Sequence, residues 1–142
     1  MKIKILIPVY NDWQSISKVI DEINNLSISQ EFQISIIVVN DASNHDRQDE
    51  EKTLENIQSI KILNMKKNQG HARCIAIGLK YIFEKEDFDY VIPMDGDGED
   101  RPEEIREFIN KINNSNDNAI VGQRIKRSEG LIFKICYQIH KL

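Results

Sequence analysis

Cysteine is scarce in this 142-residue chain, which contains only Cys74 and Cys136. The two residues lie far apart and match no spacing typical of a metal site or a redox motif. A disulfide framework and a cysteine-based zinc centre are therefore excluded, and we expect two reduced thiols, as in a cytosolic protein.

Long apolar runs are also missing. The opening sequence MKIKILIP has an apolar part too short for a signal peptide, and the run stops at Pro8. No stretch approaches the roughly 20 apolar residues that a transmembrane helix needs. We therefore expect a soluble segment located in the cytoplasm.

Positive charge is not in excess, since the net charge is −4 at pH 7. This balance argues against a general nucleic-acid binder. The charge is unevenly spread, because residues 123–142 hold five basic side chains against the single acidic Glu129. We expect this basic end to meet something anionic.

The chain does contain a regular alternation of expected strands and helices. Apolar and β-branched runs predict buried strands at 3–9, 34–39, 60–63, 89–94 and 118–122. Apolar residues at helical spacing predict helices over 13–23, 72–83 and 105–112, and a short helix is expected near 50–57. This order predicts an α/β fold with a Rossmann-like, mostly parallel sheet and helices on both faces. Ligands of such sheets bind at the carboxyl ends of the strands.

The strongest chemical pattern is the sequence DGDGED at 95–100, directly after the fourth expected strand. Four carboxylates in six residues repel one another unless a cation neutralises them, and hard oxygen ligands suit Mg²⁺ or Mn²⁺. A calcium loop of the EF-hand type is excluded, because its sixth and twelfth positions hold Asp100 and Arg106. A solvated acidic turn that caps the next helix remains the alternative.

Polar side chains also follow the first and second expected strands. Tyr10 could stack on a base whose edge Asn11 and Asp12 bind, or Asn11 or Asp12 could simply cap a helix beside a half-buried Tyr10. Asp41 could accept from a base N–H or a ribose hydroxyl, or form an Asx-turn. The chain has no Gly-rich phosphate fingerprint after the first strand and no Walker A motif, which disfavours dinucleotide and P-loop chemistry.

Five stretches together resemble glycosyltransferase family 2, and they occur in the family's order over most of the chain. The matching stretches are ILIPVYND (5–12), IIVVNDASNHD (36–46), NQGHARCIAIGL (68–79), VIPMDGDGEDRPEEI (91–105) and VGQR (121–124). The fourth is most similar to the polyprenyl-phosphate branch, whose members are similar to dolichol-phosphate mannose synthase. The resemblance implies a GT-A fold and an inverting transfer from a nucleoside-diphosphate sugar, UDP favoured over GDP. It also implies a polyprenyl phosphate or glycan acceptor and Mg²⁺ or Mn²⁺.

The resemblance also assigns roles to particular residues. It implies that Pro8, Tyr10 and Asp12 line the base pocket, that Asp41 holds the base or ribose, and that Arg73 lies near the nucleotide. Asp95 and Asp97 correspond to the DxD motif, with Glu99 as a further metal ligand. Asp97 and Arg124 are the implied catalytic residues, with Arg124 facing a phosphate group.

The sequence departs from the family pattern at several positions. Asp12 stands where Glu is usual, Asn40 replaces the first acid of an Asp-Asp pair, and Gly96 and Gly98 replace bulkier residues, which predicts a looser metal loop. Family members also continue through an acceptor-binding half. We therefore expect a nucleotide-sugar-binding domain at 1–124, followed at 125–142 by a basic amphipathic segment that leads into a missing part.

The segment 125–142 allows two interpretations. Its apolar residues fall largely along one helical face, which is typical of a helix at the inner membrane surface, but also of a helix that packs on the rest of a domain. The histidines at 45, 71 and 140 lack partners at ligand spacing and are expected at the surface. Two other functions remain: nucleotide-sugar binding without turnover, and a sugar nucleotidylyltransferase. The latter is disfavoured because PVYNDW lacks a Gly-rich basic loop.

Overall fold

The computed structural model describes residues 1–26, 28, 31–45, 53–114 and 119–122. The elements in chain order are β1 (Lys2–Val9), α1 (Trp13–Asn24), β2 (Gln33–Asn40), β3 (Ile57–Asn64), α2 (His71–Lys85), β4 (Tyr90–Pro93) and α3 (Glu104–Asn114). The chain divides into two compact units, Met1–Asn110 and Lys111–Leu142. The sheet and the candidate site belong to the first unit.

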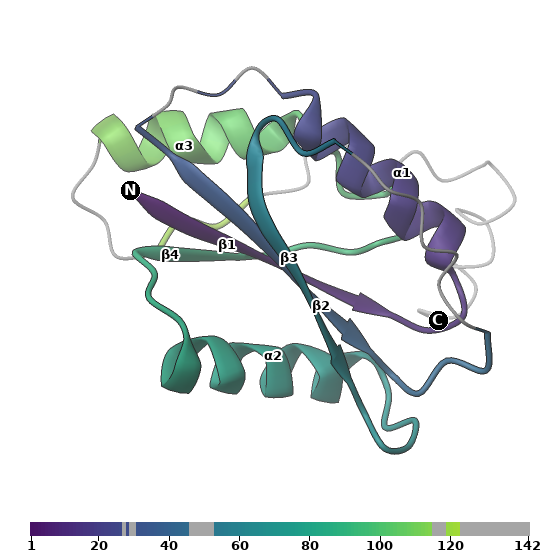
Figure 1. Ribbon diagram of the computed structural model, residues 1–142. Helices are drawn as coiled ribbons and strands as arrows, with labels where there is room; N and C mark the ends of the chain where they lie inside the picture. Colours follow the sequence, from purple (N-terminus) through teal and green to yellow (C-terminus); the bar gives the residue numbers. More distant parts are fainter. Residues whose placement is uncertain (27, 29–30, 46–52, 115–118, 123–142) are drawn as a thin grey trace, which may run out of the picture. The chain divides into compact units, whose positions relative to one another are not determined.

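The four strands form one parallel sheet in the order β3-β2-β1-β4 (Figure 1). β1 lies inside the sheet, where Ile3 pairs with Ile34 of β2 on one side and with Tyr90 of β4 on the other. A parallel sheet needs a crossover between neighbouring strands. The helix α1 supplies it between β1 and β2, and α2 lies between β3 and β4 along the chain. The predicted α/β fold with a mostly parallel sheet is confirmed.

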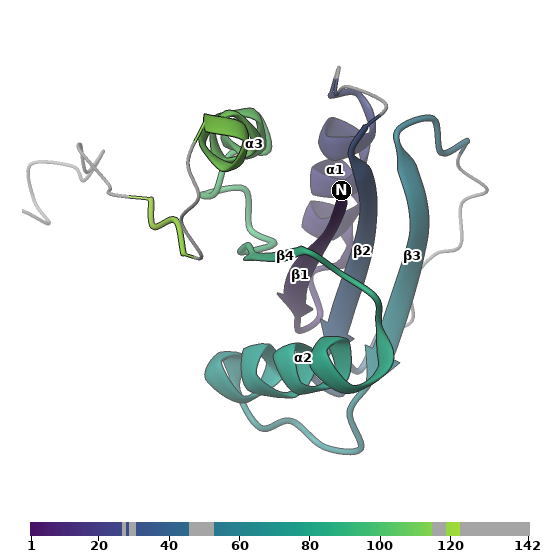
Figure 2. The same ribbon diagram turned by 90° about the vertical axis from the view of Figure 1, so that its left-hand side faces the viewer.

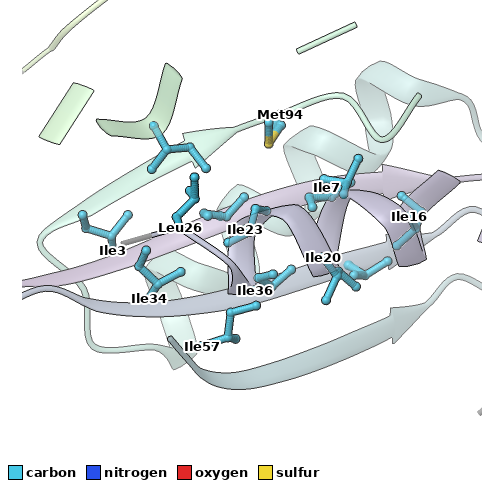
Figure 3. Packing of buried hydrophobic residues seen from close by; sticks show 14 of the residues in the cluster. Ile3, Ile7, Ile16, Ile20, Ile23, Leu26, Ile34, Ile36, Ile57 and Met94 are labelled. Carbon is cyan, nitrogen blue, oxygen red and sulfur yellow. The ribbon is translucent and has the colours of Figure 1, made fainter. Parts of the chain in front are cut away.

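Side chains of β1 alternate between two hydrophobic layers, one on each face of the sheet. Ile3, Ile5 and Ile7 belong to the larger layer, which also contains the buried face of α1 and two isoleucines of α3. Figure 3 shows Ile3 and Ile7 beside the side chains of α1. Leu6 belongs to the smaller layer, with buried residues of β2 and α2. Accordingly, α1 and α2 cover opposite faces of the sheet (Figure 2).

The helix α2 packs on the sheet through small residues. At Gly78 a Cβ would lie 2.3 Å from Leu6 Cδ1, so any larger residue would force the buried Leu6 side chain to move. Cys74 and Ile82 flank Gly78 on the buried face. The apolar positions that mark this helix in the sequence are largely exposed, and Phe83 has 80% of its surface accessible.

The prediction of a helix near 50–57 is wrong for residues 53–57, the part of this range that the structure describes. Residues 53–56 are not helical, and β3 begins at Ile57. The side chain of Asn24, at the end of α1, accepts from the backbone N–H groups of Glu55 and Asn56 and donates to Thr53 O. These contacts satisfy the backbone groups that a helical turn would otherwise pair.

The predicted strand at 118–122 is also not observed, since residues 119–122 carry no strand. A short apolar stretch becomes a strand only where it pairs with a neighbour. Residue 118 and the whole predicted C-terminal segment 125–142 lie outside the described residues. None of the helices α1, α2 and α3 is long and apolar enough to cross a membrane.

Candidate functional site

A pocket of about 200 Å³ lies at the carboxyl ends of β1 and β4, beside the first residue of α2. Its walls come from three segments that are distant in sequence but converge because parallel strands end at the same edge of the sheet. The lining residues are Pro8, Val9, Tyr10, Asp12, Ile16, His71, Asp95, Gly96 and Asp97.

The turn after β1 presents an aromatic side chain to this pocket. Asn11 has a positive φ of 60°, and its backbone N–H donates to Ser43 Oγ at 2.8 Å. Its side-chain Oδ1 accepts from the backbone N–H of Asn44 at 2.7 Å, which ties this turn to the loop after β2. Tyr10 remains 47% exposed at the pocket wall, available for stacking.

Asp12 has two roles in the structure. Its Oδ1 accepts from the backbone N–H of Ser15 at 3.2 Å, so the residue caps α1. The same residue also lines the pocket. The capping interpretation is therefore confirmed for Asp12, and it is compatible with ligand binding.

The acidic loop after β4 is closed by its own carboxylates. Asp100 Oδ2 accepts from the backbone N–H of Asp95 at 2.9 Å, and Asp97 Oδ1 accepts from that of Glu99 at 2.9 Å. A Cβ at Gly96 would lie 2.2 Å from Cδ1 of the buried Ile16, so glycine brings the loop against α1. Gly96, one of the two glycines expected to loosen the loop, lets it pack closely against Ile16.

Electrostatics single out Asp95 within this loop. Partial burial raises the pKa of its carboxyl group, and the neighbouring carboxylates of Asp100, Asp97 and Glu99 raise it further, whereas His71 opposes them. His71 Nε2 lies 3.4 Å from Asp95 Oδ1. His71 is exposed, as expected, but it also lines the pocket and lies within ion-pair distance of Asp95, which sequence analysis did not predict.

The residues fit a divalent cation that arrives with a phosphorylated ligand. Asp95 and Asp97 line the same pocket. Within the described part of the chain, no three His, Cys, Asp or Glu side chains are placed to hold a metal by themselves. Mg²⁺ is commonly held by one or two carboxylates together with substrate phosphates and water, so a two-carboxylate site suits it.

The structure places the other predicted residues outside the pocket lining. Asp41 is buried, with 4% exposed, and its two oxygens accept from the backbone N–H groups of Gln69 and Gly70. Arg73 is exposed and donates to Gln69 Oε1 at 2.9 Å. Glu99 is also exposed. Arg124 lies outside the described residues.

Five predicted residues thus meet in one pocket, namely Pro8, Tyr10, Asp12, Asp95 and Asp97. Sequence analysis missed His71, although a signal was present: it directly follows Asn68-Gln69-Gly70, which breaks the chain before a helix. A residue at the start of a helix that leaves the carboxyl edge of a parallel sheet is well placed to line a site.

A parallel sheet with helices on both faces and an acidic pocket at its carboxyl edge is the architecture of the GT-A glycosyltransferases. The chain belongs to glycosyl transferase family 2, whose domain matches residues 4–135. Among solved structures, residues 1–349 of Staphylococcus aureus TarS superpose with a TM-score of 0.60 at 16% identity, over 89% of this chain and 40% of that one. The same TarS segment in complex with UDP-GlcNAc gives a TM-score of 0.60 at 15% identity, over 89% and 39%.

Curated relatives include two enzymes whose names contain a polyprenyl phosphate. The dolichol-phosphate mannosyltransferase of Pyrococcus furiosus is 27% identical over 126 residues, covering 89% of this chain and 34% of the relative. The dodecaprenyl-phosphate galacturonate synthase of Rhizobium johnstonii is 20% identical over 142 residues, covering 94% and 39%. The chain spans only part of its relatives, at most 50% of the length of these two and of a related uncharacterized protein from Methanocaldococcus jannaschii.

Proposed function

We propose that this chain is the donor-binding part of a metal-dependent, inverting glycosyltransferase. Its donor is a nucleoside-diphosphate sugar, with UDP favoured over GDP, and its acceptor is a polyprenyl phosphate or a glycan. The observation that carries the proposal is one pocket that combines the exposed ring of Tyr10 and the carboxylate of Asp12 with Asp95 and Asp97. An aromatic ring suits a base, and paired carboxylates suit a cation that accompanies a diphosphate.

Each side chain takes a distinct task in this proposal. Tyr10 stacks on the base beside Pro8, and Asp12 accepts from the edge of the base. Asp95 and Asp97 hold the cation together with phosphate oxygens of the donor and water. Arg73 acts on the nucleotide side, and Arg124, outside the described residues, faces a phosphate group. Asp41 supports the site indirectly, because its carboxylate holds the turn at Gln69 and Gly70.

The proposed reaction is a single displacement at the anomeric carbon. The acceptor oxygen forms a bond to C1 as the bond from C1 to the diphosphate oxygen breaks, and the nucleoside diphosphate leaves with the electron pair. A divalent cation bound there would stabilise the charge that builds on the leaving diphosphate. Attack opposite the leaving group inverts the configuration at C1.

The nature of the acceptor rests on the relatives. Two of them are named for transfer involving dolichol phosphate or dodecaprenyl phosphate, which supports a lipid-phosphate acceptor. Such an acceptor is found at a membrane, so we propose a cytoplasmic protein whose basic segment 125–142 contacts the inner membrane face. The acceptor phosphate is already anionic and can attack without a protein base.

A second candidate function is nucleotide-sugar binding without turnover. It needs only the pocket at the carboxyl ends of β1 and β4. Donor binding without transfer to polyprenyl phosphate and without donor hydrolysis supports this alternative.

Calorimetric titration of UDP and GDP, with and without Mn²⁺, tests the donor site. We expect UDP to bind in the presence of Mn²⁺ and the variant Asp97→Asn to lose about tenfold or more in affinity. Glu84→Gln is the matched control, because it also removes one negative charge but from an exposed position on α2. Failure of both nucleotides to bind the folded chain would overturn the proposal.

A further inference from the structure

The pocket lining contains one histidine, His71, to which the proposed function assigns no role. His71 lies opposite the acidic loop, with 3.4 Å between its Nε2 and Asp95 Oδ1. Both side chains are about half exposed, at 58% and 47%, so each remains accessible from the pocket. No other histidine contributes to the described pocket lining.

The position of His71 is fixed by the loop before it. The buried carboxylate of Asp41 accepts from the backbone N–H groups of Gln69 and Gly70 at 2.7 and 2.8 Å. Gly70 has a φ of 90°, which turns the chain directly into α2. His71 is the next residue, so the contact between Asp41 and this turn determines where the imidazole enters the pocket.

The loop of Asp95 places several like charges near its side chain. Within the loop, its backbone N–H is bonded to Asp100, while the carboxylates of Asp97, Asp100 and Glu99 surround its side chain with like charge. A carboxylate that binds a cation through one oxygen is commonly oriented by a hydrogen bond to the other. The imidazole Nε2 of His71 lies 3.4 Å from Asp95 Oδ1, within ion-pair distance of the carboxylate.

We propose that His71 is a positioning residue of the donor site, which holds the Asp95 carboxylate in the orientation that binds the cation. The inference rests on the proposed function, since it requires that Asp95 and Asp97 bind a cation with the nucleotide. His71 does not itself ligate the cation. Apo distances between such partners are often long and shorten when the ligand binds, which is consistent with 3.4 Å.

Mn²⁺ affinity of the 142-residue chain in the presence of UDP tests this inference. The electron paramagnetic resonance signal of free Mn²⁺ gives the affinity, and pulsed measurements detect nitrogen coupled to the bound ion. We expect His71→Ala to weaken Mn²⁺ binding about 10-fold or more, as loss of an outer partner typically does. His71→Gln keeps an N–H donor near the position of Nε2 and is expected to restore most of the affinity.

His45→Ala is the matched control, since it removes a histidine that does not line the pocket, and it should bind Mn²⁺ like the unmodified chain. Equal Mn²⁺ affinity of His71→Ala and the unmodified chain would overturn the inference while leaving the donor site intact. Strong nitrogen coupling that disappears in His71→Ala would also overturn it, because His71 would then be a direct ligand. If the unmodified chain binds no Mn²⁺ with UDP, the proposed function itself fails and this inference fails with it.

Discussion

The buried carboxylate of Asp41 accepts a hydrogen bond from the backbone N–H of Gly70, with 2.8 Å between Oδ2 and N. Its second oxygen accepts from the N–H of Gln69 at 2.7 Å. Both acceptors of the side chain are thus used to join the end of β2 to the start of α2. This arrangement requires two acceptor oxygens, which asparagine does not have.

The variant Asp41→Asn should therefore destabilise the chain in the absence of any ligand. An amide would place an NH₂ group against a backbone N–H, and losing a buried bond to a charged acceptor costs about 1.5–3 kcal/mol. Urea denaturation followed by circular dichroism measures the change in the free energy of unfolding. Asp89→Asn is the control, because Asp89 also accepts from a backbone N–H, that of Lys2 at 2.7 Å, but at an exposed position. Equal losses in the two variants would contradict a special role for Asp41.

The contact between Gly96 and Ile16 predicts a specific double-mutant result. Gly96→Ala places a Cβ 2.2 Å from Ile16 Cδ1, and overpacking of this kind typically costs about 1–3 kcal/mol of stability. Ile16→Val removes that Cδ1 atom. The two substitutions together should destabilise the chain less than the sum of the single effects, by about 1 kcal/mol.

Thermal or urea unfolding of the four proteins in this cycle gives the coupling energy. Gly98→Ala serves as a contrast, since Gly98 has a φ of 85° with open space around it, and its cost comes from the backbone alone. Ile16→Val should therefore give no relief to Gly98→Ala. Strict additivity between Gly96→Ala and Ile16→Val would show that the loop does not pack on α1 in this way.

The carboxylate of Glu86, only 7% exposed, predicts a pH-dependent stability. Hydrogen bonds from Lys61 and Lys4 lower the pKa of Glu86 below its ordinary value of 4.5, although burial opposes the shift. A pKa lowered by folding gives stability that is present above the unfolded value and is lost as the pH falls through the folded value. Glu86→Gln should therefore lower the free energy of unfolding by about 1–3 kcal/mol at pH 7.

The same variant should approach the stability of the unmodified chain as the pH falls through the folded-state pKa of Glu86, which lies below 4.5, because the carboxyl group is then protonated in both states. Urea denaturation across this pH range measures the convergence. Glu84→Gln, on the exposed side of α2, should show little difference at any pH. A gap between Glu86→Gln and the unmodified chain that does not narrow in acid would contradict this account.

Much of the fold could be predicted because local patterns and chain connectivity agree. The apolar runs marked four strands of the sheet, and alternation with helices required parallel pairing. The meeting of Tyr10, Asp12, Asp95 and Asp97 then followed, since the carboxyl ends of parallel strands share one edge. The roles of these residues in binding stay predictions until a ligand is measured.

The failures came from contacts between distant segments. Asn24 holds residues 53–56 outside a helix, which the local sequence does not indicate. The buried face of α2 depends on Gly78 lying against Leu6. The spacing of apolar residues over 72–83 does not indicate this contact, and Phe83 within that range is exposed. His71 was missed because its partner, Asp95, is far away along the chain.

The donor pocket is tested most directly by titrating the isotope-labelled chain with UDP and Mg²⁺ while recording backbone amide NMR signals. The account predicts that the signals of Tyr10, His71, Asp95, Gly96 and Asp97 shift together and saturably, and that those of the exposed face of α2, such as Phe83, do not. Shifts that gather away from these residues, or none up to millimolar UDP, would contradict the claim that this pocket binds the nucleotide.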